Sequence, residues 1–93
     1  MIVGTCLVDL RIPGCRSLKE KRQIVKALKD SIRRKYNISI AELDHHDTWQ
    51  RTLIGIAAIS SNARFANQVL SKVVNVIEAN NSVQLIDYKL EMR

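Results

Sequence analysis

The sequence predicts an α+β protein of the ferredoxin-like class, a β-α-β-β-α-β sandwich with two helices on one face of a four-stranded antiparallel sheet. Segments with alternating apolar residues and segments with helical apolar spacing follow one another in this order along the chain. Each of the two helical segments has one apolar stripe, which a shared sheet face would bury. A pair of unrelated hairpins would leave these stripes without a common surface. With 93 residues the chain has room for one such domain, spanning residues 1–93.

The chain begins with the pattern of a strand followed by a helix. In residues 2–12 every even-numbered residue is apolar or glycine, so the even-numbered side chains should face the core. After a Pro-Gly turn, Ser17 and Glu20 fit a capping box, which begins a helix. This helix should run to about residue 36, with Asn37 as its C-terminal cap.

The remaining pattern predicts two strands, a second helix and a last strand. The second strand covers residues 38–45, and a polar turn at 46–48 leads into a third strand at about 49–59. Residues 60–62 supply N-cap candidates for the second helix, and the last strand covers about 83–91. The apolar positions of the second helix are Phe65, Val69, Val73, Val76 and Ile77.

Two cysteines, Cys6 and Cys15, indicate a reducing compartment rather than a disulfide framework. Residues 6–12 of the first strand already span about 20 Å, against a Cα limit of about 7 Å for a disulfide. The absence of a Cys-x-x-Cys pair argues against a thioredoxin-type redox site and a zinc knuckle. There is no signal-peptide pattern and no apolar run of about 20 residues, so we expect a cytoplasmic protein without membrane contact.

The positive charge of the chain is concentrated in the first helix. The chain has 15 Lys and Arg against 9 Asp and Glu, a net charge of +6, which favours nucleic acid as a partner. Residues 16–35 contain nine of these basic residues and only two of the acidic ones. At about 100° per residue, five cations fall within roughly 80° of arc and form a stripe about 20 Å long, which can follow a phosphate backbone. We define this basic stripe as Lys19, Arg22, Lys26, Lys29 and Arg33.

The alternative interpretation of the basic stripe is an ordinary solvated helix face with i,i+4 ion pairs, such as Lys26 with Asp30. The beginning of the helix favours the binding interpretation. Lys19, Lys21 and Arg22 lie there, where the helix dipole disfavours each cation by about 0.3–1 kcal/mol. Three such residues predict that an external anion meets the free N–H groups of this turn.

A second polar cluster, residues 44–51, follows the second strand. Because the first two strands run in the same direction in this topology, the loop after the first strand, the first helical turn and this hairpin tip should meet at one corner. In an RNA site, the histidines would form hydrogen bonds, Arg51 would contact phosphate and Trp49 would stack on a base. The corner would present Arg16, Lys19, Arg22, His45, His46, Trp49 and Arg51.

Three other interpretations of the corner remain open. A metal site could use residues 44–47, but adjacent strand residues point to opposite faces and do not easily converge on one ion. His45 and Asp47 could form an acid–base pair, yet no nucleophile has recognisable flanking residues, although Cys15 could lie near. In an ordinary polar turn, Trp49 would cover the end of the core. We therefore predict no catalytic residue, no metal and no cofactor.

The order of elements matches that of RNA-recognition motifs, yet the mode of RNA binding should differ. Such motifs stack bases on aromatic side chains of their central strands, and residues 51–59 contain no aromatic residue. This absence favours phosphate contacts through the first helix over recognition on the sheet face.

The chain also resembles a known family. The runs that carry the resemblance are Met1-Ile2-Val3-Gly4, Ile12-Pro13-Gly14, Ser17-Leu18-Lys19-Glu20-Lys21-Arg22, Ala41-Glu42-Leu43-Asp44-His45 and Trp49-Gln50-Arg51. Over nearly the whole chain they are similar to the YlxP-like family, small bacterial domains of largely unknown function. The resemblance implies a ferredoxin-like fold and no established catalytic residues. The family's genes typically lie among those for transcription and translation factors and ribosome maturation, which implies a connection with RNA or the ribosome. Relatives often have Gln where this chain has His46, which weakens a metal or acid–base role for His46.

We therefore expect a non-enzymatic RNA-binding protein, associated with the ribosome or an assembly intermediate, whose first helix contacts phosphates. The competing hypothesis is a protein-interaction or homo-oligomerisation module. It rests on Val3, Thr5 and Leu7, which would lie on the open sheet face, because apolar open faces often pair with another copy.

Overall fold

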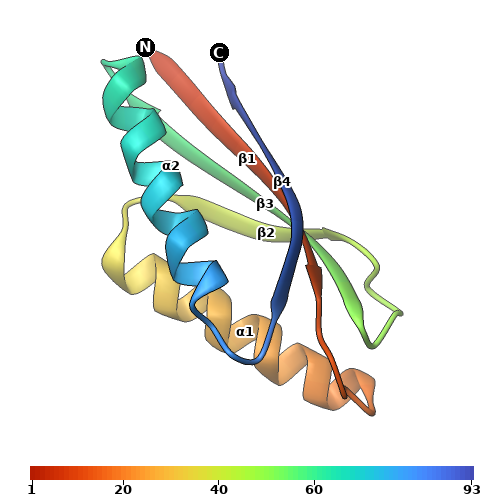
Figure 1. Cartoon of the computed structure of the whole chain (residues 1–93). Helices are drawn as coiled ribbons and strands as arrows, with labels where there is room; N and C mark the ends of the chain where they lie inside the picture. The colour runs from red at the N-terminus through yellow and green to blue at the C-terminus, as the bar shows by residue number, and fades with distance from the viewer.

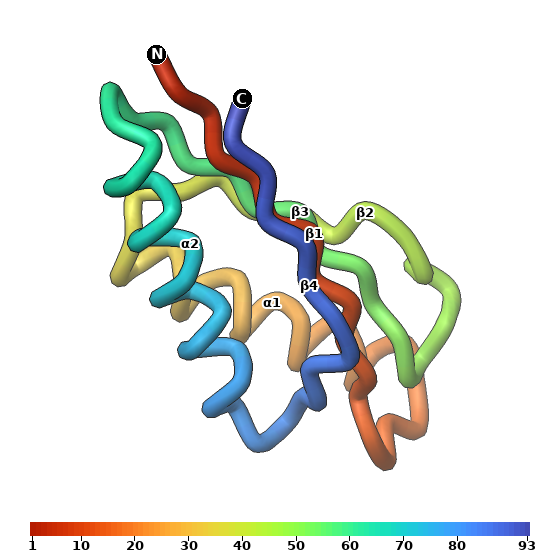
Figure 2. The backbone as a smooth tube through the Cα atoms, turned by 45° about the horizontal axis from the view of Figure 1, so that its top comes forward, coloured from red at the N-terminus to blue at the C-terminus, as the bar shows by residue number.

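The computed structural model describes residues 1–93 and has the β-α-β-β-α-β order that the sequence predicts. The elements are β1 (Ile2–Arg11), α1 (Leu18–Lys35), β2 (Ser39–Asp44), β3 (Arg51–Ser60), α2 (Ala63–Glu78) and β4 (Gln84–Met92). Neighbouring strands are all antiparallel, in the order β2-β3-β1-β4, and both helices lie on one face of the sheet (Figures 1 and 2). The prediction of a ferredoxin-like α+β fold is confirmed. Neither helix is long and apolar enough to cross a bilayer.

The core lies between the helices and the face of the sheet to which β1 contributes its even-numbered side chains. Gly4, Cys6, Val8 and Leu10 are buried, as the alternation predicts. A β carbon at Gly4 would lie 2.9 Å from Cδ1 of Leu70, so the missing side chain lets α2 pack directly on β1. The helices bury on this face Val25, Leu28 and Ile32 of α1 and Ala66, Leu70, Val73, Val74 and Ile77 of α2.

The buried face of α2 differs from the predicted one at its N-terminal end. Phe65 was expected in the apolar stripe but is 58% exposed, whereas its neighbour Ala66 is buried. The reason is the contact between Leu70 and Gly4, which fixes the rotation of α2 about its axis. At about 100° per residue, Phe65 then lies some 140° away from Leu70 and points to solvent.

Both ends of α1 are fixed by local contacts. The hydroxyl of Ser17 accepts a hydrogen bond from the Glu20 N–H at 3.1 Å, which confirms this part of the capping box, and the Glu20 carboxylate accepts from the Arg16 N–H at 3.3 Å. At the other end the prediction of Asn37 as the cap is wrong. Tyr36 is the C-cap, because its backbone is already extended and its side chain packs against the core.

The turn between β2 and β3 is longer than predicted. The third strand was expected from about Trp49, but β3 begins at Arg51, and Trp49 lies outside it. His45 has a φ of 64°, in the left-handed region, and its carbonyl accepts a hydrogen bond from the Thr48 N–H at 3.0 Å. This turn ends β2 at Asp44 and delays the start of β3.

A buried ion pair that the sequence did not predict attaches α1 to β2. Lys21 is 1% exposed, and its Nζ lies 2.9 Å from Oε2 of Glu42. The same Nζ donates to the carbonyl of His45, and the Thr52 hydroxyl donates to Oε2 of Glu42 at 2.5 Å. The prediction that Lys21 helps to attract an external anion is therefore wrong, because its charge is neutralised inside the protein.

The same network lowers the pKa of the Glu42 carboxyl. Burial of the carboxylate acts to raise this pKa, but the hydrogen bonds from Thr52 and Lys21, together with the charge of Lys21, outweigh that effect. Glu42 is therefore charged in the folded protein at neutral pH, and the pair is ionic.

We predict that Glu42→Gln lowers the free energy of unfolding at neutral pH by about 3 kcal/mol, because Lys21 would be buried without a counter-charge. Urea unfolding measures this loss. The double change Lys21→Met with Glu42→Leu should recover most of it, since apolar residues of similar size can replace a buried pair. The control is Asp30→Asn, which removes the exposed ion pairs of Asp30 with Lys26 and Arg33 and should cost far less stability. Equal losses for Glu42→Gln and Asp30→Asn would contradict the prediction.

The effect of Glu42 on stability should also depend on pH. Because its folded-state pKa is lowered, its stabilising contribution is complete above the ordinary value of 4.5 and is lost as the pH falls through the folded-state pKa. The difference in unfolding free energy between the wild type and Glu42→Gln should stay constant from about pH 7 to 5 and shrink below about pH 4.5. Urea unfolding across this range tests the prediction, which fails if the difference persists undiminished at about pH 3.

Candidate nucleic-acid interface

The loop after β1, the start of α1 and the β2–β3 hairpin meet at one end of the sheet, as the topology predicts. The Ile12 N–H donates to the carbonyl of Gln50 at 2.9 Å, and the Gln50 side chain donates to the carbonyl of Cys15 at 3.4 Å. Lys21 joins α1 to the same hairpin at the His45 carbonyl. Five of the seven residues predicted for this corner are exposed, namely Arg16, Lys19, Arg22, His46 and Trp49.

The basic stripe borders a groove between α1 and β2. The groove has a volume of about 350 Å³, and four of the five stripe residues line it. They are Arg22, Lys26, Lys29 and Arg33, and the other lining residues are Lys21, Val25, Asp30 and Glu42. Lys19 lies almost one turn before Arg22 and is exposed. The structure therefore brings the predicted cations together along one side of α1.

Most of the charge of the stripe is unpaired. Asp30 accepts a hydrogen bond from Nζ of Lys26 at 2.9 Å, and this bond is the main cause of the lowered pKa of the Asp30 carboxyl. No carboxylate lies within ion-pair distance of Lys19, Arg22 or Lys29. Three cations on one face of α1 are thus available to an external anion.

Arg33, at the far end of the stripe, has a structural contact. Its Nη2 donates to the carbonyl of Ile40 in β2 at 3.0 Å, and its Nη1 lies 3.5 Å from Asp30. Arg33 therefore contacts the sheet, unlike Lys19, Arg22 and Lys29 of the stripe. The side chain is long enough to reach β2 across the groove, so Arg33 joins Lys21 in holding α1 against this strand.

Arg51 does not join the stripe, because it lies on the other face of the sheet. Its neighbour Thr52 is fully buried under the helices, and adjacent strand residues point to opposite faces. On the open face, Nη2 of Arg51 lies 2.9 Å from both carboxylate oxygens of Asp9. The predicted grouping of Arg51 with the start of α1 at one corner is wrong for this reason.

The hairpin offers one large side chain to a partner. Trp49 is 49% exposed, which favours a contact residue over a cover for the core. His46 is exposed. His45 is half-buried, and its backbone N–H donates a hydrogen bond to the Asp44 carboxylate at 2.7 Å. No group of three or more His, Cys, Asp or Glu side chains in the chain is arranged to hold a metal ion.

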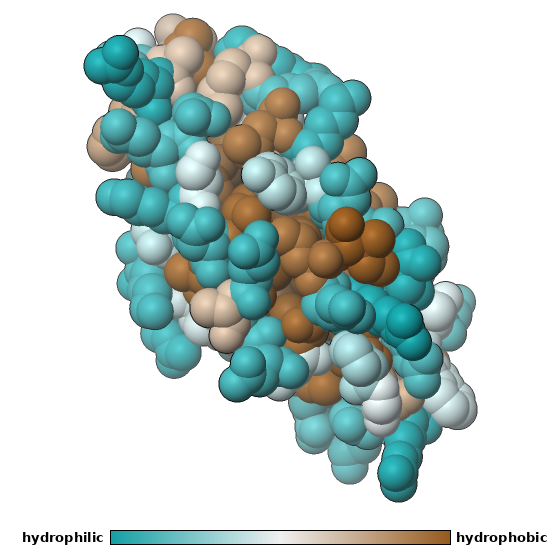
Figure 3. All heavy atoms as spheres, viewed as in Figure 1, coloured by the Kyte–Doolittle hydropathy of each residue, from teal (hydrophilic) through white to brown (hydrophobic).

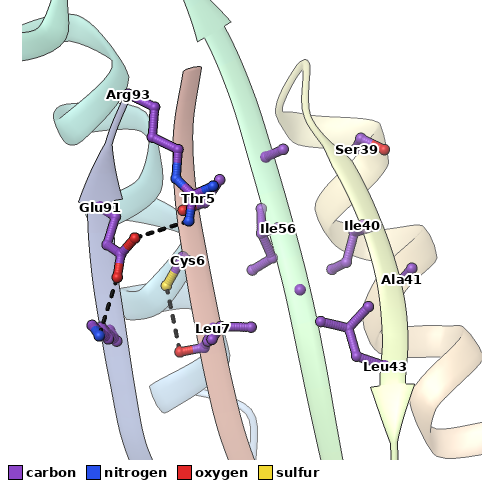
Figure 4. Close-up of a pocket in the computed structure, with 13 residues that line it drawn as sticks. Thr5, Cys6, Leu7, Ser39, Ile40, Ala41, Leu43, Ile56, Glu91 and Arg93 are labelled. Carbon is purple, nitrogen blue, oxygen red and sulfur yellow. Dashed lines mark hydrogen bonds and ion pairs between the residues drawn. The ribbon is translucent and has the colours of Figure 1, made fainter. Parts of the chain in front are cut away.

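The open face of the sheet has an apolar trough that the sequence revealed only in part. The trough has a volume of about 350 Å³ and lies over Gly55 and Ala57 of β3, with Leu7 and Leu43 on either side (Figure 4). A β carbon at Gly55 would lie 2.6 Å from Cδ1 of Leu43, so Leu43 can lie across β3 only because residue 55 is glycine. A glycine within a strand pattern is the signal that points to such a close approach.

Known proteins resemble this chain in sequence and in fold. Residues 3–90 match the family described as "Protein of unknown function (DUF503)". The protein of Bacillus subtilis (strain 168) named "Uncharacterized protein YlxP" is 43% identical over 78 residues, which cover 84% of this chain and 85% of that relative. The solved structure of "De novo designed protein Foldit4" matches with a TM-score of 0.52 at 9% identity, over all of this chain and 94% of the designed one, and this likeness concerns the fold alone. The resemblance to the YlxP-like family is confirmed, and the chain belongs to the DUF503 family.

Proposed function

We propose that this protein binds structured RNA through the basic stripe of α1 and acts by binding rather than by catalysis. The observation that supports this most directly is the set of three stripe cations without an acidic partner, Lys19, Arg22 and Lys29. They follow one another at intervals of about one or two helical turns, so each can contact a different phosphate. Such contacts release counterions, and the affinity should therefore fall steeply with salt.

The cellular setting of the proposal follows from the YlxP-like resemblance. The genes of this family typically accompany those for translation factors and ribosome maturation, which favours ribosomal RNA, on the ribosome or on an assembly intermediate in the cytoplasm. Crosslinking in living cells, followed by sequencing of the attached RNA, tests this setting. An RNA library enriched in ribosomal sequences is the expected result, and an empty library would remove the proposal.

We predict that replacing Lys19, Arg22 and Lys29 by Gln weakens RNA binding without unfolding the protein. Each lost phosphate contact should reduce the slope of log affinity against log salt by about 0.7–0.9, so the slope should fall by about 2 to 3. The fold should persist, because none of these side chains has a partner in the protein and Gln is a good helix former. A labelled RNA hairpin of about 20 nucleotides, titrated at several salt concentrations, measures both affinity and slope.

The matched control replaces Arg11, Arg64 and Lys72 by Gln. These residues are exposed, have no ion-pair partner and lie outside α1, so the control removes the same charge elsewhere. It should change the salt slope little. Equal losses in both variants would show that only net charge matters, and unchanged binding in both would show that the stripe is a solvated face.

We predict that Trp49→Ala separates binding from stability. Since half of the side chain is exposed, the free energy of unfolding measured in urea should fall by under about 1 kcal/mol, against about 3 kcal/mol or more for a buried tryptophan. If Trp49 stacks on a base, affinity for the same RNA should fall by about 1–3 kcal/mol, and Trp49→Phe should retain most of it. A large loss of stability would show instead that Trp49 covers the end of the core.

The open-face trough supports a second candidate function, the binding of a partner protein. Leu43 is 51% exposed beside the small residues of β3, which makes an apolar surface that a partner could cover. Salt distinguishes the two candidates, because burial of apolar surface responds little to ionic strength whereas phosphate contacts respond steeply. The unpaired cations make RNA the first candidate.

A further inference from the structure

The two edges of the sheet differ in how well they are protected. The β2 edge is six residues long, its register shifts between Glu42 and Asp44, and Arg33 occupies the carbonyl of Ile40. Short length, irregularity and covering side chains are the usual means of blocking an edge strand. The other edge, β4, is nine residues long, contains no proline and pairs regularly with β1 from Asp87 to Met92. No element lies on its outer side (Figure 1).

Alternate residues of β4 present free backbone groups at this edge. Arg93 and Val3 exchange two hydrogen bonds of 2.9 Å, so Arg93 and every second residue before it point their backbone groups at β1. The N–H of Tyr88 agrees with this alternation, because it bonds to the side chain of Asp87 at 2.9 Å instead of to β1. The residues whose backbone groups point outward are Tyr88, Leu90 and Met92.

From Asp87 to Arg93 the side chains alternate between charged and apolar. Lys89 and Glu91 pair with Leu7 and Thr5, which face the open side of the sheet, so the odd-numbered residues from Asp87 to Arg93 lie there. Their charges alternate in sign along the strand, and Glu91 bonds to both Lys89 and Arg93 within the chain (Figure 4). The even-numbered side chains of this segment, Tyr88, Leu90 and Met92, are apolar in character. Apolar residues are exposed on the side of the molecule that Figure 3 shows. In order, the strand segment reads Asp87, Tyr88, Lys89, Leu90, Glu91, Met92, Arg93.

We propose that two copies of this chain pair through β4 as antiparallel strands, with Leu90 opposite Leu90 of the second copy. In this register Lys89 faces Glu91 of the second copy, and Asp87 faces Arg93 of the second copy, so every charge meets its opposite. On the helix side, Tyr88 faces Met92 of the second copy, and the contact is apolar. The free backbone groups match as well. With Leu90 opposite Leu90 of the second copy, the outward-pointing N–H and C=O groups of the two strands face each other and can form hydrogen bonds. On pairing, the Tyr88 N–H passes from Asp87 to the strand of the second copy.

Neighbouring registers are disfavoured by the same charges. A register centred on Lys89 places this residue opposite itself and Asp87 opposite Glu91. A register centred on Glu91 places this residue opposite itself and Lys89 opposite Arg93. Both juxtapose like charges, which destabilise directly opposite positions of a strand pair. A shift by a single residue would set outward-pointing backbone groups against residues whose groups are bonded to β1. Registers centred on Tyr88 or Met92 match fewer charges, because they pair only Asp87 with Lys89 or Glu91 with Arg93. The register centred on Leu90 is therefore the one in which the most opposite charges meet.

Sedimentation of the full chain over about 5 to 500 μM tests the pairing, and a concentration-dependent dimer is expected. Lys89→Glu creates two like-charge pairs in each dimer and should weaken association at least about tenfold. Adding Glu91→Lys to this variant restores opposite charges and should return the affinity to within about threefold of the wild type. Lys72→Glu, the control, makes the same change of charge on α2 and should leave the dimer intact. In hydrogen exchange, the Leu90 amide should be protected only at high concentration, whereas the Lys89 amide is protected by β1 throughout.

Four results would overturn the proposal. They are a monomer at every concentration, a dimer that tolerates Lys89→Glu, a double variant that remains as weak as Lys89→Glu, and a dimer abolished by Leu43→Glu on the open face but not by changes in β4. The last result would assign the interface to the open-face trough. None of these measurements uses RNA, so the pairing through β4 and the proposed RNA binding are tested independently of each other.

Discussion

A charged amine lies buried beneath the β2–β3 hairpin, and the position of α1 depends on how that charge is neutralised. Lys21 needs a carboxylate and a carbonyl, and Glu42 and His45 supply them only when the start of α1 lies against β2. Arg33 repeats the arrangement three turns later at the carbonyl of Ile40. These two contacts, about 18 Å apart along the helix, fix the position of α1 along β2 and its rotation about its own axis.

The rotation of α1 determines which of its basic residues are available to a partner. With Lys21 and Arg33 turned to β2, the cations between them line the groove, and the apolar residues Val25, Leu28 and Ile32 face the core. Some of the basic composition of α1 is thus structural, and the rest is presented along one line. A helix whose charges were all solvated would have no such fixed direction.

The sequence was sufficient for features that depend on local periodicity and insufficient for those that depend on contacts between elements. The alternation in β1 and the capping box of Ser17 were predictable, because each is set by residues close in the chain. The rotation that exposes Phe65 was not, because it depends on Leu70 fitting over the distant Gly4. The stripe itself followed from helical spacing. The division of the basic residues of α1 into structural and free cations could not be predicted, because the partners Glu42 and Ile40 lie on another element.

The central place of β1 has a consequence for the order in which the protein assembles. This strand comes first in the chain, yet it lies between β3 and β4, and its pairing with β4 brings Val3 beside Arg93. Pairings between such distant residues require closure of a long loop before any contact is gained, so they slow folding. The β2–β3 hairpin, joined by a short turn, can form early. During synthesis one edge of β1 therefore remains unpaired until β4 has left the ribosome.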